Sequence, residues 1–306
     1  MLSTSRRRFL QSTTALASAA ACGALIPGLG FGLPCVSSAS GAEEFDEAAI
    51  TFGLVTYMWG ADWDLPTLLK NCKETGVLGV ELRTTHAHKV EPELDEKGRE
   101  EVRSRFAASG VTFVGIGSDE RFDNPDPAVV KKAVERTKEF VRLSHDIGGS
   151  GVKVKPDKFH PDVAKEKTIE QIGKALNEVG EYAAGFGQEI RLEVHGQCAE
   201  LPTIKAIMDV AQDANVAVCW NSNPTDLKGD GLEANFNLVR KRFGTTCHVR
   251  ELDTPDYPFA DLMKLLVKSK YVGWMLLEAS SKPADRIAAL TAQRKLFDEL
   301  LEKARA

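Results

Sequence analysis

From residue 50 onward, the chain alternates eight times between a short apolar segment and a longer amphipathic segment. Short runs rich in Val, Ile and Leu predict β-strands, and longer segments with apolar residues every three or four positions predict helices. The predicted strands span residues 50–57, 79–85, 111–118, 151–155, 189–195, 216–221, 246–252 and 273–280. The predicted helices span residues 65–75, 96–109, 126–147, 168–186, 201–214, 231–243, 259–269 and 284–304.

Strands that alternate with helices form parallel βαβ units, so the chain is predicted to be an α/β protein. Eight such units in about 250 residues fit a (βα)8 TIM barrel. The alternative is a doubly wound open sheet, which usually has a glycine-rich phosphate loop after its first strand. No GxGxxG sequence follows residues 50–57. We therefore predict one barrel domain over residues 43–306, because no linker-like stretch interrupts it.

The first 42 residues carry a different pattern. Residues 6–8 are three arginines, residues 13–33 are uncharged and rich in Ala, Gly and Leu, and residues 40–42 are the small residues Ser-Gly-Ala. This order is typical of a cleaved signal peptide of the twin-arginine (Tat) export pathway. It predicts an exported, periplasmic protein with no stable membrane insertion after cleavage. An uncleaved membrane anchor is the alternative, which the glycines and the proline of the apolar stretch disfavour.

Charge and cysteine content exclude several kinds of partner and site. The formal net charge of −5 gives no electrostatic support for a nucleic-acid partner. The four cysteines beyond the signal are Cys72, Cys198, Cys219 and Cys247, and none forms a CxxC pair. A zinc knuckle or a redox dithiol is therefore unsupported, and we expect buried free thiols. A homo-oligomer is compatible with the sequence but not specified by it.

One polar residue near the end of each of the last four strands recurs at the length of one βα unit. These residues are Glu193, Asn221, His248 and Glu278, at spacings of 28, 27 and 30 residues. In a barrel, this spacing brings four side chains around one point inside the C-terminal mouth. Burying two carboxylates there is costly unless a cation compensates them. The oxygen-rich set favours one divalent ion, Mn²⁺ or Mg²⁺, with Co²⁺, Fe²⁺ or Zn²⁺ as alternatives.

Side-chain alternation indicates that these residues face the barrel axis. In the strand 189–195 the polar residues, including Glu193 and His195, share one face, while residues 190, 192 and 194 are apolar and must face the helices. Lys153 and Lys155 are set against apolar neighbours in the same way. An alternative without a metal therefore stays open, in which the glutamates pair only with inward lysines and arginines such as Lys153.

The order and spacing of these motifs resemble the xylose isomerase-like TIM-barrel superfamily, also called sugar phosphate isomerases/epimerases, from about residue 50 to the end. The motifs are LEVHG, CWNSN, HVRE and LLEAS. In that family a Glu, an Asp, a His and a Glu on strands five to eight bind one metal ion. The resemblance therefore implies that Glu193, Asn221, His248 and Glu278 are ligands. Asn221 departs from the pattern, since an amide oxygen brings no charge, which implies weaker metal binding and leaves a decayed, non-catalytic site open.

The same resemblance implies a metal-dependent sugar isomerase or epimerase with a small-molecule carbohydrate substrate. Glu193 and Glu278 would be both ligands and the acid–base pair, removing and returning a proton next to a carbonyl through an enediolate. Two alternatives remain: a lyase or hydratase acting on oxidised (3-keto) sugars or glycosides, and a non-catalytic carbohydrate-binding barrel. Export disfavours a phosphorylated substrate. Export and the acidic net charge together disfavour a DNA-repair role like that of endonuclease IV.

Four further residues at the mouth are candidates for binding substrate: His195, Lys155, Arg250 and Trp59. Each has a simpler alternative. His195 could only hydrogen-bond a neighbouring carboxylate, Lys155 and Arg250 could only balance the charge of the glutamates, and Trp59 could only pack.

Strand two and the loop after it add weaker expectations. Glu81 and Arg83 share one face and are expected to pair with each other. His86 and His88 are expected to be solvated, with a second metal site as the alternative.

Overall fold

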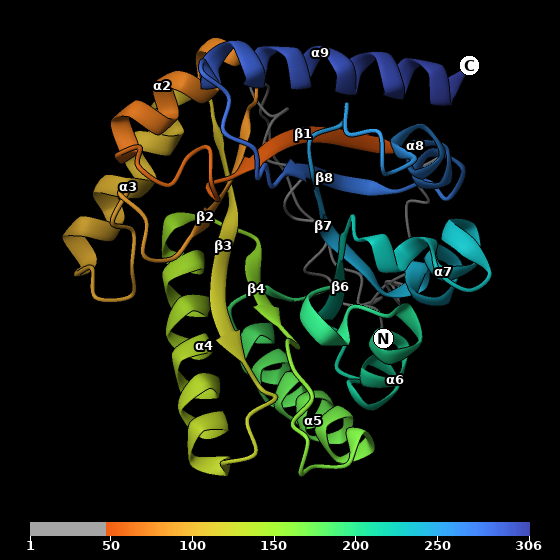
Figure 1. Ribbon diagram of the computed structural model, residues 1–306. Coiled ribbons are helices and arrows are strands. Elements are labelled where there is room, and N and C mark those ends of the chain that lie inside the picture. Colours follow the sequence, from red (N-terminus) through yellow and green to blue (C-terminus); the bar gives the residue numbers. More distant parts are fainter. Residues whose placement is uncertain (1–46) are drawn as a thin grey trace, which may run out of the picture.

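Eight parallel strands close into a barrel in chain order, so that β1 pairs with both β2 and β8. The protein is seen in a computed structural model that describes residues 47–306 (Figure 1). The strands are β1 (Ala49–Val55), β2 (Gly79–Arg83), β3 (Thr112–Arg121), β4 (Gly151–Lys155), β5 (Glu189–Glu193), β6 (Val216–Asn221), β7 (Phe243–Val249) and β8 (Val272–Leu277). The helices are α2 (Leu65–Thr75), α3 (Glu96–Ser109), α4 (Pro127–Ile147), α5 (Lys165–Ala184), α6 (Leu201–Val210), α7 (Gly231–Val239), α8 (Phe259–Lys268) and α9 (Arg286–Arg305). Short 3-10 helices η2 (Gly196–Cys198), η3 (Pro224–Leu227) and η4 (Arg240–Arg242) lie in the connections.

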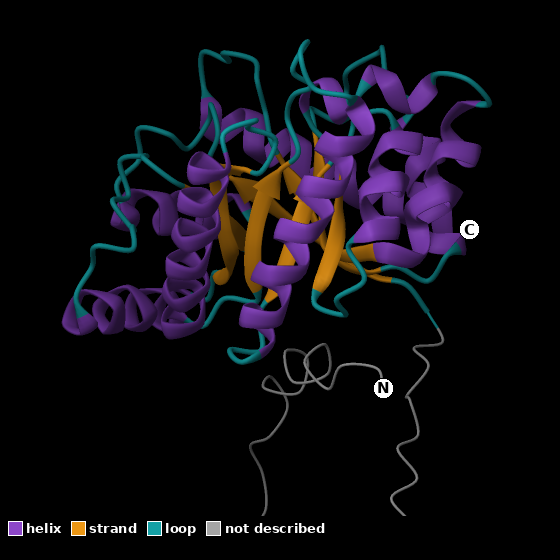
Figure 2. Ribbon diagram, turned by 90° about the horizontal axis from the view of Figure 1, so that it is seen from below, coloured by secondary structure: helices purple, strands orange, loops and turns teal. Residues whose placement is uncertain are grey.

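The helices surround the strands, as Figure 2 shows. The outward side chains of the strands are apolar and fully buried between the two layers, for example Val152 and Val154 in β4 and Ile190 and Leu192 in β5. Burial of this apolar surface is the main driving force that places the helices outside the barrel. The predicted (βα)8 fold is confirmed.

The interior of the barrel is packed, so any site must lie at its mouth. Val55, Val114, Trp274 and Leu276 form a separate apolar cluster. The Trp274 ring needs a glycine opposite it, because a Cβ atom built on Gly79 would lie 2.1 Å from the ring. A filled interior of this kind is typical of TIM barrels, which bind ligands at the C-terminal ends of their strands.

Helices α2 and α3 begin and end where the sequence indicates. The side chains of Asp64 and Asp95 accept hydrogen bonds from backbone N–H groups at the starts of α2 and α3. Gly76 and Gly110 follow these helices with φ of 72° and 77°, a left-handed conformation that side chains disfavour.

Several boundaries differ from the prediction, and two of the differences affect the site or the core. β3 was expected to end at residue 118 but continues to Arg121. Helix 231–243 was expected as one element, but α7 ends at Val239, η4 follows, and Phe243 already begins β7. Phe243 packs against Trp220 and Phe236, with ring centroids 5.7 and 5.2 Å away. This aromatic packing outweighs the helical pattern of the local sequence.

The expected free thiols are confirmed: Cys72, Cys198, Cys219 and Cys247 are buried and form no disulfide. The predicted signal peptide, residues 1–42, lies outside the described residues. Within residues 47–306, no helix combines the length and the apolar character needed to cross a membrane.

Candidate metal centre

Four polar side chains converge at the C-terminal mouth of the barrel, one from the end of each of β5, β6, β7 and β8. Asn221 and His248 are register partners on β6 and β7. Glu278 directly follows β8, where its backbone N–H continues the ladder by donating to the Val249 carbonyl at 2.8 Å. We call Glu193, Asn221, His248 and Glu278 the donor cluster.

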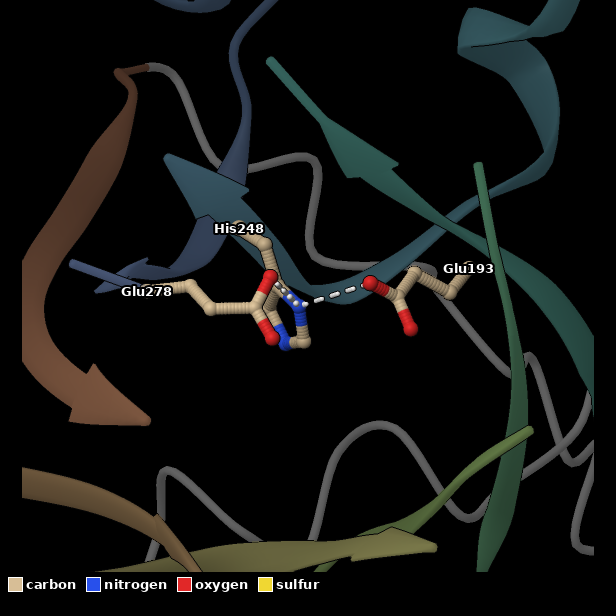
Figure 3. Close-up of side chains that lie close together, drawn as sticks. All are labelled: Glu193, His248 and Glu278. Atoms are coloured by element: carbon tan, nitrogen blue, oxygen red, sulfur yellow. Dashed lines mark ion pairs between the residues drawn. The ribbon is translucent and has the colours of Figure 1, made fainter. Parts of the chain in front are cut away.

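The side chains of Glu193, His248 and Glu278 lie close together (Figure 3), and one potential ligand atom from each lies within 4.8 Å of the others. His248 Nδ1 is 3.7 Å from Glu193 Oε1 and 3.6 Å from Glu278 Oε2, so both carboxylates face the same ring nitrogen. The Asn221 amide donates to Glu193 Oε1 at 2.9 Å and to Glu278 Oε2 at 3.4 Å. Glu193 and His248 are fully buried, while the side chain of Glu278 is 16% exposed. Solvent therefore reaches these three side chains on the side where Glu278 lies.

This geometry fits a divalent ion. Atoms that bind one ion at about 2.0–2.3 Å are separated from one another by roughly 3.0–3.8 Å. The carboxylate–imidazole distances fall in this range and are too long for hydrogen bonds. His248 Nδ1 is buried and has no hydrogen-bond partner among the described residues. A buried nitrogen left in this way between two carboxylate oxygens is well placed to be a metal ligand.

Glu81 faces the other ring nitrogen of His248. Glu81 Oε1 lies 3.1 Å from His248 Nε2, and both side chains are fully buried. A proton on Nε2 would face this carboxylate and leave the Nδ1 lone pair for an ion, which is the usual arrangement behind metal-binding histidines. The expected pairing of Glu81 with Arg83 is wrong: Arg83 Nη2 instead donates to Asp119 at 3.2 Å. Sequence alternation showed the face that these residues share but not their partners across the barrel.

Lys153 lies at the floor of the donor cluster. Its Nζ is 2.8 Å from Glu193 Oε2, and neither side chain is exposed. Burial alone would raise the pKa of Glu193, but the charge of Lys153 and the contact with His248 hold it well below its ordinary value. The ion pair considered from the sequence as an alternative to a metal is therefore present. It occupies Oε2 only, and Oε1 still faces the other donors.

The sequence comparisons identify the family of this barrel. The family model for the xylose isomerase-like TIM barrel matches residues 69–300. The chain belongs to the xylose isomerase-like TIM-barrel family. The resemblance noted in the strand-end motifs is thereby confirmed. No curated protein sequence matches the chain closely enough to be called a relative.

Solved structures of similar fold include several sugar epimerases. The apo form of the E. coli 3-keto-D-glucoside 4-epimerase YcjR has a TM-score of 0.70 at 14% identity, covering 82% of this chain and 99% of that one. An L-ribulose 3-epimerase has a TM-score of 0.71 at 18% identity, covering 83% and 95%. The IolI protein with a bound zinc atom has a TM-score of 0.69 at 16% identity, covering 83% and 99%. At these identities, the likeness establishes the fold.

Of the four residues predicted to bind substrate, two lie in an ion-pair network above the donor cluster. Lys155 Nζ donates to Asp119 Oδ1 at 2.8 Å. His195 Nδ1 lies 2.9 Å from Asp157 Oδ1. Both candidate residues thus have acidic partners, and these acids were missed in the sequence. Asp119 was missed because β3 was predicted to end at residue 118, and Asp157 because it lies in the loop after β4.

The other two candidates have structural contacts. Trp59 is 3% exposed, and its Nε1 donates to the Ser281 carbonyl at 2.9 Å, so little of its ring is free to stack on a sugar. Arg250 Nε donates to the Ser222 carbonyl at 3.2 Å, and the guanidinium pairs with Asp256. Trp59 therefore packs at the mouth, and Arg250 balances the charge of Asp256 instead of that of the glutamates. Roles of the two residues in substrate binding stay predictions.

Among residues 47–306, the two loop histidines after β2 belong to no group of three or more potential metal ligands. The expectation that they are solvated is wrong for His88, which is 6% exposed. Its Nε2 lies 2.8 Å from the Arg83 carbonyl, and its Nδ1 accepts from the Val90 N–H at 3.0 Å. Burial lowers the pKa of His88 to about 4, so it is a neutral residue that fixes the loop.

Proposed function

We propose that this barrel is a metal-dependent sugar isomerase or epimerase with Glu193, Asn221, His248 and Glu278 as the ligands of one divalent ion. The observation that carries this proposal is the convergence of three potential ligand atoms, from Glu193, His248 and Glu278, on one point of the mouth, with the amide group of Asn221 beside them. Three oxygen donors and one nitrogen favour Mn²⁺ or Mg²⁺. Zn²⁺, Co²⁺ and Fe²⁺ remain alternatives, and the IolI structure was solved with zinc.

The proposed chemistry is proton transfer at the carbon next to a sugar carbonyl. A bound divalent ion supplies Lewis-acid polarisation of the carbonyl and its neighbouring hydroxyl. Glu278, whose side chain is the more exposed of the two glutamates, removes the proton and keeps it. Glu193, which must be protonated at the start of turnover, delivers its own proton on the other face of the enediolate, and proton exchange with solvent then restores both groups.

The test combines metal analysis with two variants. We expect purified protein to contain or to bind about one Mn²⁺ per chain, and to convert one of a panel of keto- and aldo-sugars. Glu193→Gln and Glu278→Gln should each lower turnover at least about 100-fold while leaving the fold intact. Glu200→Gln, an exposed glutamate after β5, is the matched control. Retained turnover in both Gln variants would reject the proposal.

A second candidate is a lyase that begins with the same proton removal. The likeness to a 3-keto-D-glucoside 4-epimerase supports testing 3-keto-glucosides, from which a lyase would release the aglycone and an epimerase would not. A non-catalytic carbohydrate-binding barrel would bind these sugars without converting them. We further propose that residues 1–42 direct export to the periplasm through the twin-arginine pathway, which fractionation of cells expressing the full chain and its Arg6→Lys/Arg7→Lys variant would test.

A further inference from the structure

The mouth of the barrel is divided into two halves of opposite chemical character. The donor cluster occupies the ends of β5 to β8. The ends of β2 to β5 carry a second set, which we call the rim network: Arg83, Asp119, Arg121, Lys155, Asp157 and His195. Because residues two apart on a strand share a face, Arg83 lies one level above Glu81, Lys155 above Lys153 and His195 above Glu193.

Three cations of the rim network converge on one carboxylate. Asp119 Oδ1 accepts from Lys155 at 2.8 Å, from Arg83 at 3.2 Å and from Arg121 at 3.3 Å. Burial alone would raise the pKa of Asp119, but the hydrogen bond from Lys155 and the guanidinium charges lower it. Arg121 Nε also lies 2.8 Å from Asp157 Oδ2. The network therefore holds three permanent cations against two carboxylates.

These cations are more buried than the acid they share. The side chains of Lys155 and Arg83 are 7% and 19% exposed, whereas that of Asp119 is 43% exposed. Asp119, Arg121 and Asp157 also line an open hollow of about 630 Å³ between the rim and α4, which neither Lys155 nor Arg83 lines. The Arg121 side chain is 38% exposed. A carboxylate held at the solvent side of two largely buried cations, beside the more exposed Arg121, sits where an incoming anion could share or replace its contacts. Partly buried charges attract an anion more strongly than exposed ones do.

We infer that the rim network is a subsite for the carboxylate of a sugar acid. This inference rests on the proposed function, since it names the class of sugar whose other end reaches the donor cluster. Lys153 touches Glu193 in the donor cluster, and Lys155 lies two residues further along the same strand, about 6.6 Å away. The donor cluster and the rim network are therefore separated by about the length of one sugar unit. A neutral sugar would leave the excess positive charge of the rim unmatched.

The test compares sugars that differ only in a terminal carboxylate or hydroxymethyl group. Binding to the Mn²⁺-supplemented protein is measured by calorimetry for D-glucuronate and D-glucose, D-galacturonate and D-galactose, and D-fructuronate and D-fructose. We expect at least one acid to bind about tenfold or more tightly than its neutral partner, with affinity falling as salt rises. Equal binding within every pair, or tighter binding of the neutral sugar in each, would overturn the inference.

Three variants separate a ligand subsite from a purely structural network. Lys155→Met and Arg83→Met should each weaken binding of the acid about tenfold while changing that of the neutral sugar by less than about twofold. Asp119→Asn should tighten binding of the acid, because it frees the three cations. Lys205→Met, an exposed lysine of α6, is the control and should change neither. If Asp119→Asn weakens the acid and the neutral sugar alike, the network only holds the strand ends together.

The proposed function can fail independently of this subsite. Conversion of a neutral sugar without preference for its acid would leave the proposed function standing and overturn the subsite. Preferential binding of the acid by protein that neither binds Mn²⁺ nor converts any sugar would support the subsite and reject the isomerase.

Discussion

The two oxygens of Glu193 have different partners, and this division organises the proposed site. Oε2 pairs with Lys153 at 2.8 Å, while Oε1 accepts from the Asn221 amide at 2.9 Å and faces His248. A carboxylate fixed at one oxygen by a buried ammonium can offer the other to an ion without reorienting. Such preorganisation by neighbouring residues is what usually tunes a metal site.

Asn221 is the residue that most distinguishes this donor cluster. Replacing it with Asp adds a negative charge beside Glu193 and Glu278, which should tighten Mn²⁺ binding by about tenfold or more. The same change removes the amide donor and sets three carboxylates together, so the metal-free protein should become less stable. Calorimetry and thermal unfolding with and without Mn²⁺ measure both effects. Asn237→Asp on the outer helix α7 is the control; unchanged Mn²⁺ affinity in Asn221→Asp would contradict a ligand role.

At the scale of elements, the end of each strand from β5 to β8 places one residue of the donor cluster at the mouth. The connection that follows the strand holds that end in position by hydrogen bonds. The connection after β6 is the clearest case. The Asn223 side chain donates to the Val194 carbonyl at 2.7 Å, which ties this connection to the end of β5. Asp226 in η3 accepts from the Asn223 N–H at 2.9 Å and from the Tyr257 hydroxyl at 2.7 Å. A buried carboxyl group thus supports the turn behind the donor cluster.

Burial raises the pKa of Asp226 to about 7, despite the opposing hydrogen bond from Tyr257 and the charge of Arg250. Because the folded-state pKa lies above the unfolded value, this group stabilises the fold fully at low pH. The contribution, of at most roughly 4 kcal/mol, is lost as the pH rises from about 4 to 7. Asp226→Asn should remove this loss, so the variant gains stability relative to the wild type between pH 5 and pH 8.

Urea unfolding at several pH values in this range measures the difference between Asp226→Asn and the wild type. Asp209→Asn, an exposed aspartate of α6, is the control, with a difference that should not vary with pH. A difference for Asp226→Asn that is equally constant with pH would show that Asp226 is already ionised in the folded protein.

At the scale of the whole molecule, the barrel encloses several charges that no single element could bury. Glu81, Lys153, Glu193 and His248 are all fully buried, and they come from four strands. Burial opposes the charge on Lys153, but Glu193, Glu278 and Glu81 together raise its pKa above the ordinary value. Lys153 is therefore an internal cation for the acidic residues of the mouth, with or without a metal ion.

Lys153→Met should leave these carboxylates without their buried cation. Removing one partner of a buried ion pair typically costs about 3–5 kcal/mol, so the metal-free variant should unfold at a clearly lower temperature. A divalent ion would replace part of the lost charge, and Mn²⁺ should therefore raise the melting temperature of the variant by at least about 4 °C more than that of the wild type.

The control for this experiment is Lys138→Met, which removes a lysine that pairs with two carboxylates on the outer surface, Glu135 and Glu178. Its response to Mn²⁺ should equal that of the wild type. If Lys153→Met also responds like the wild type, the ion does not bind next to Glu193.

Local patterns in the sequence were sufficient for the fold. The alternation of strands and helices, the Asp caps such as Asp64 and the glycine stops such as Gly76 depend on interactions within a few residues, so they are visible before folding. The spacing of Glu193, Asn221, His248 and Glu278 predicted that they would meet, because a closed barrel brings equivalent positions of successive units together. Their roles as ligands and as acid–base residues stay predictions.

Only the tertiary structure decided which side chains face one another across the barrel. Glu81 faces His248 instead of Arg83, Lys153 pairs with Glu193, and Arg83 meets Lys155 at Asp119. These partners come from different strands, and the tilt and register that bring them together are properties of the closed sheet. The sequence of a strand determines which of its faces is polar. Which polar groups then meet is determined by how the strands are tilted and aligned when the sheet closes into a barrel.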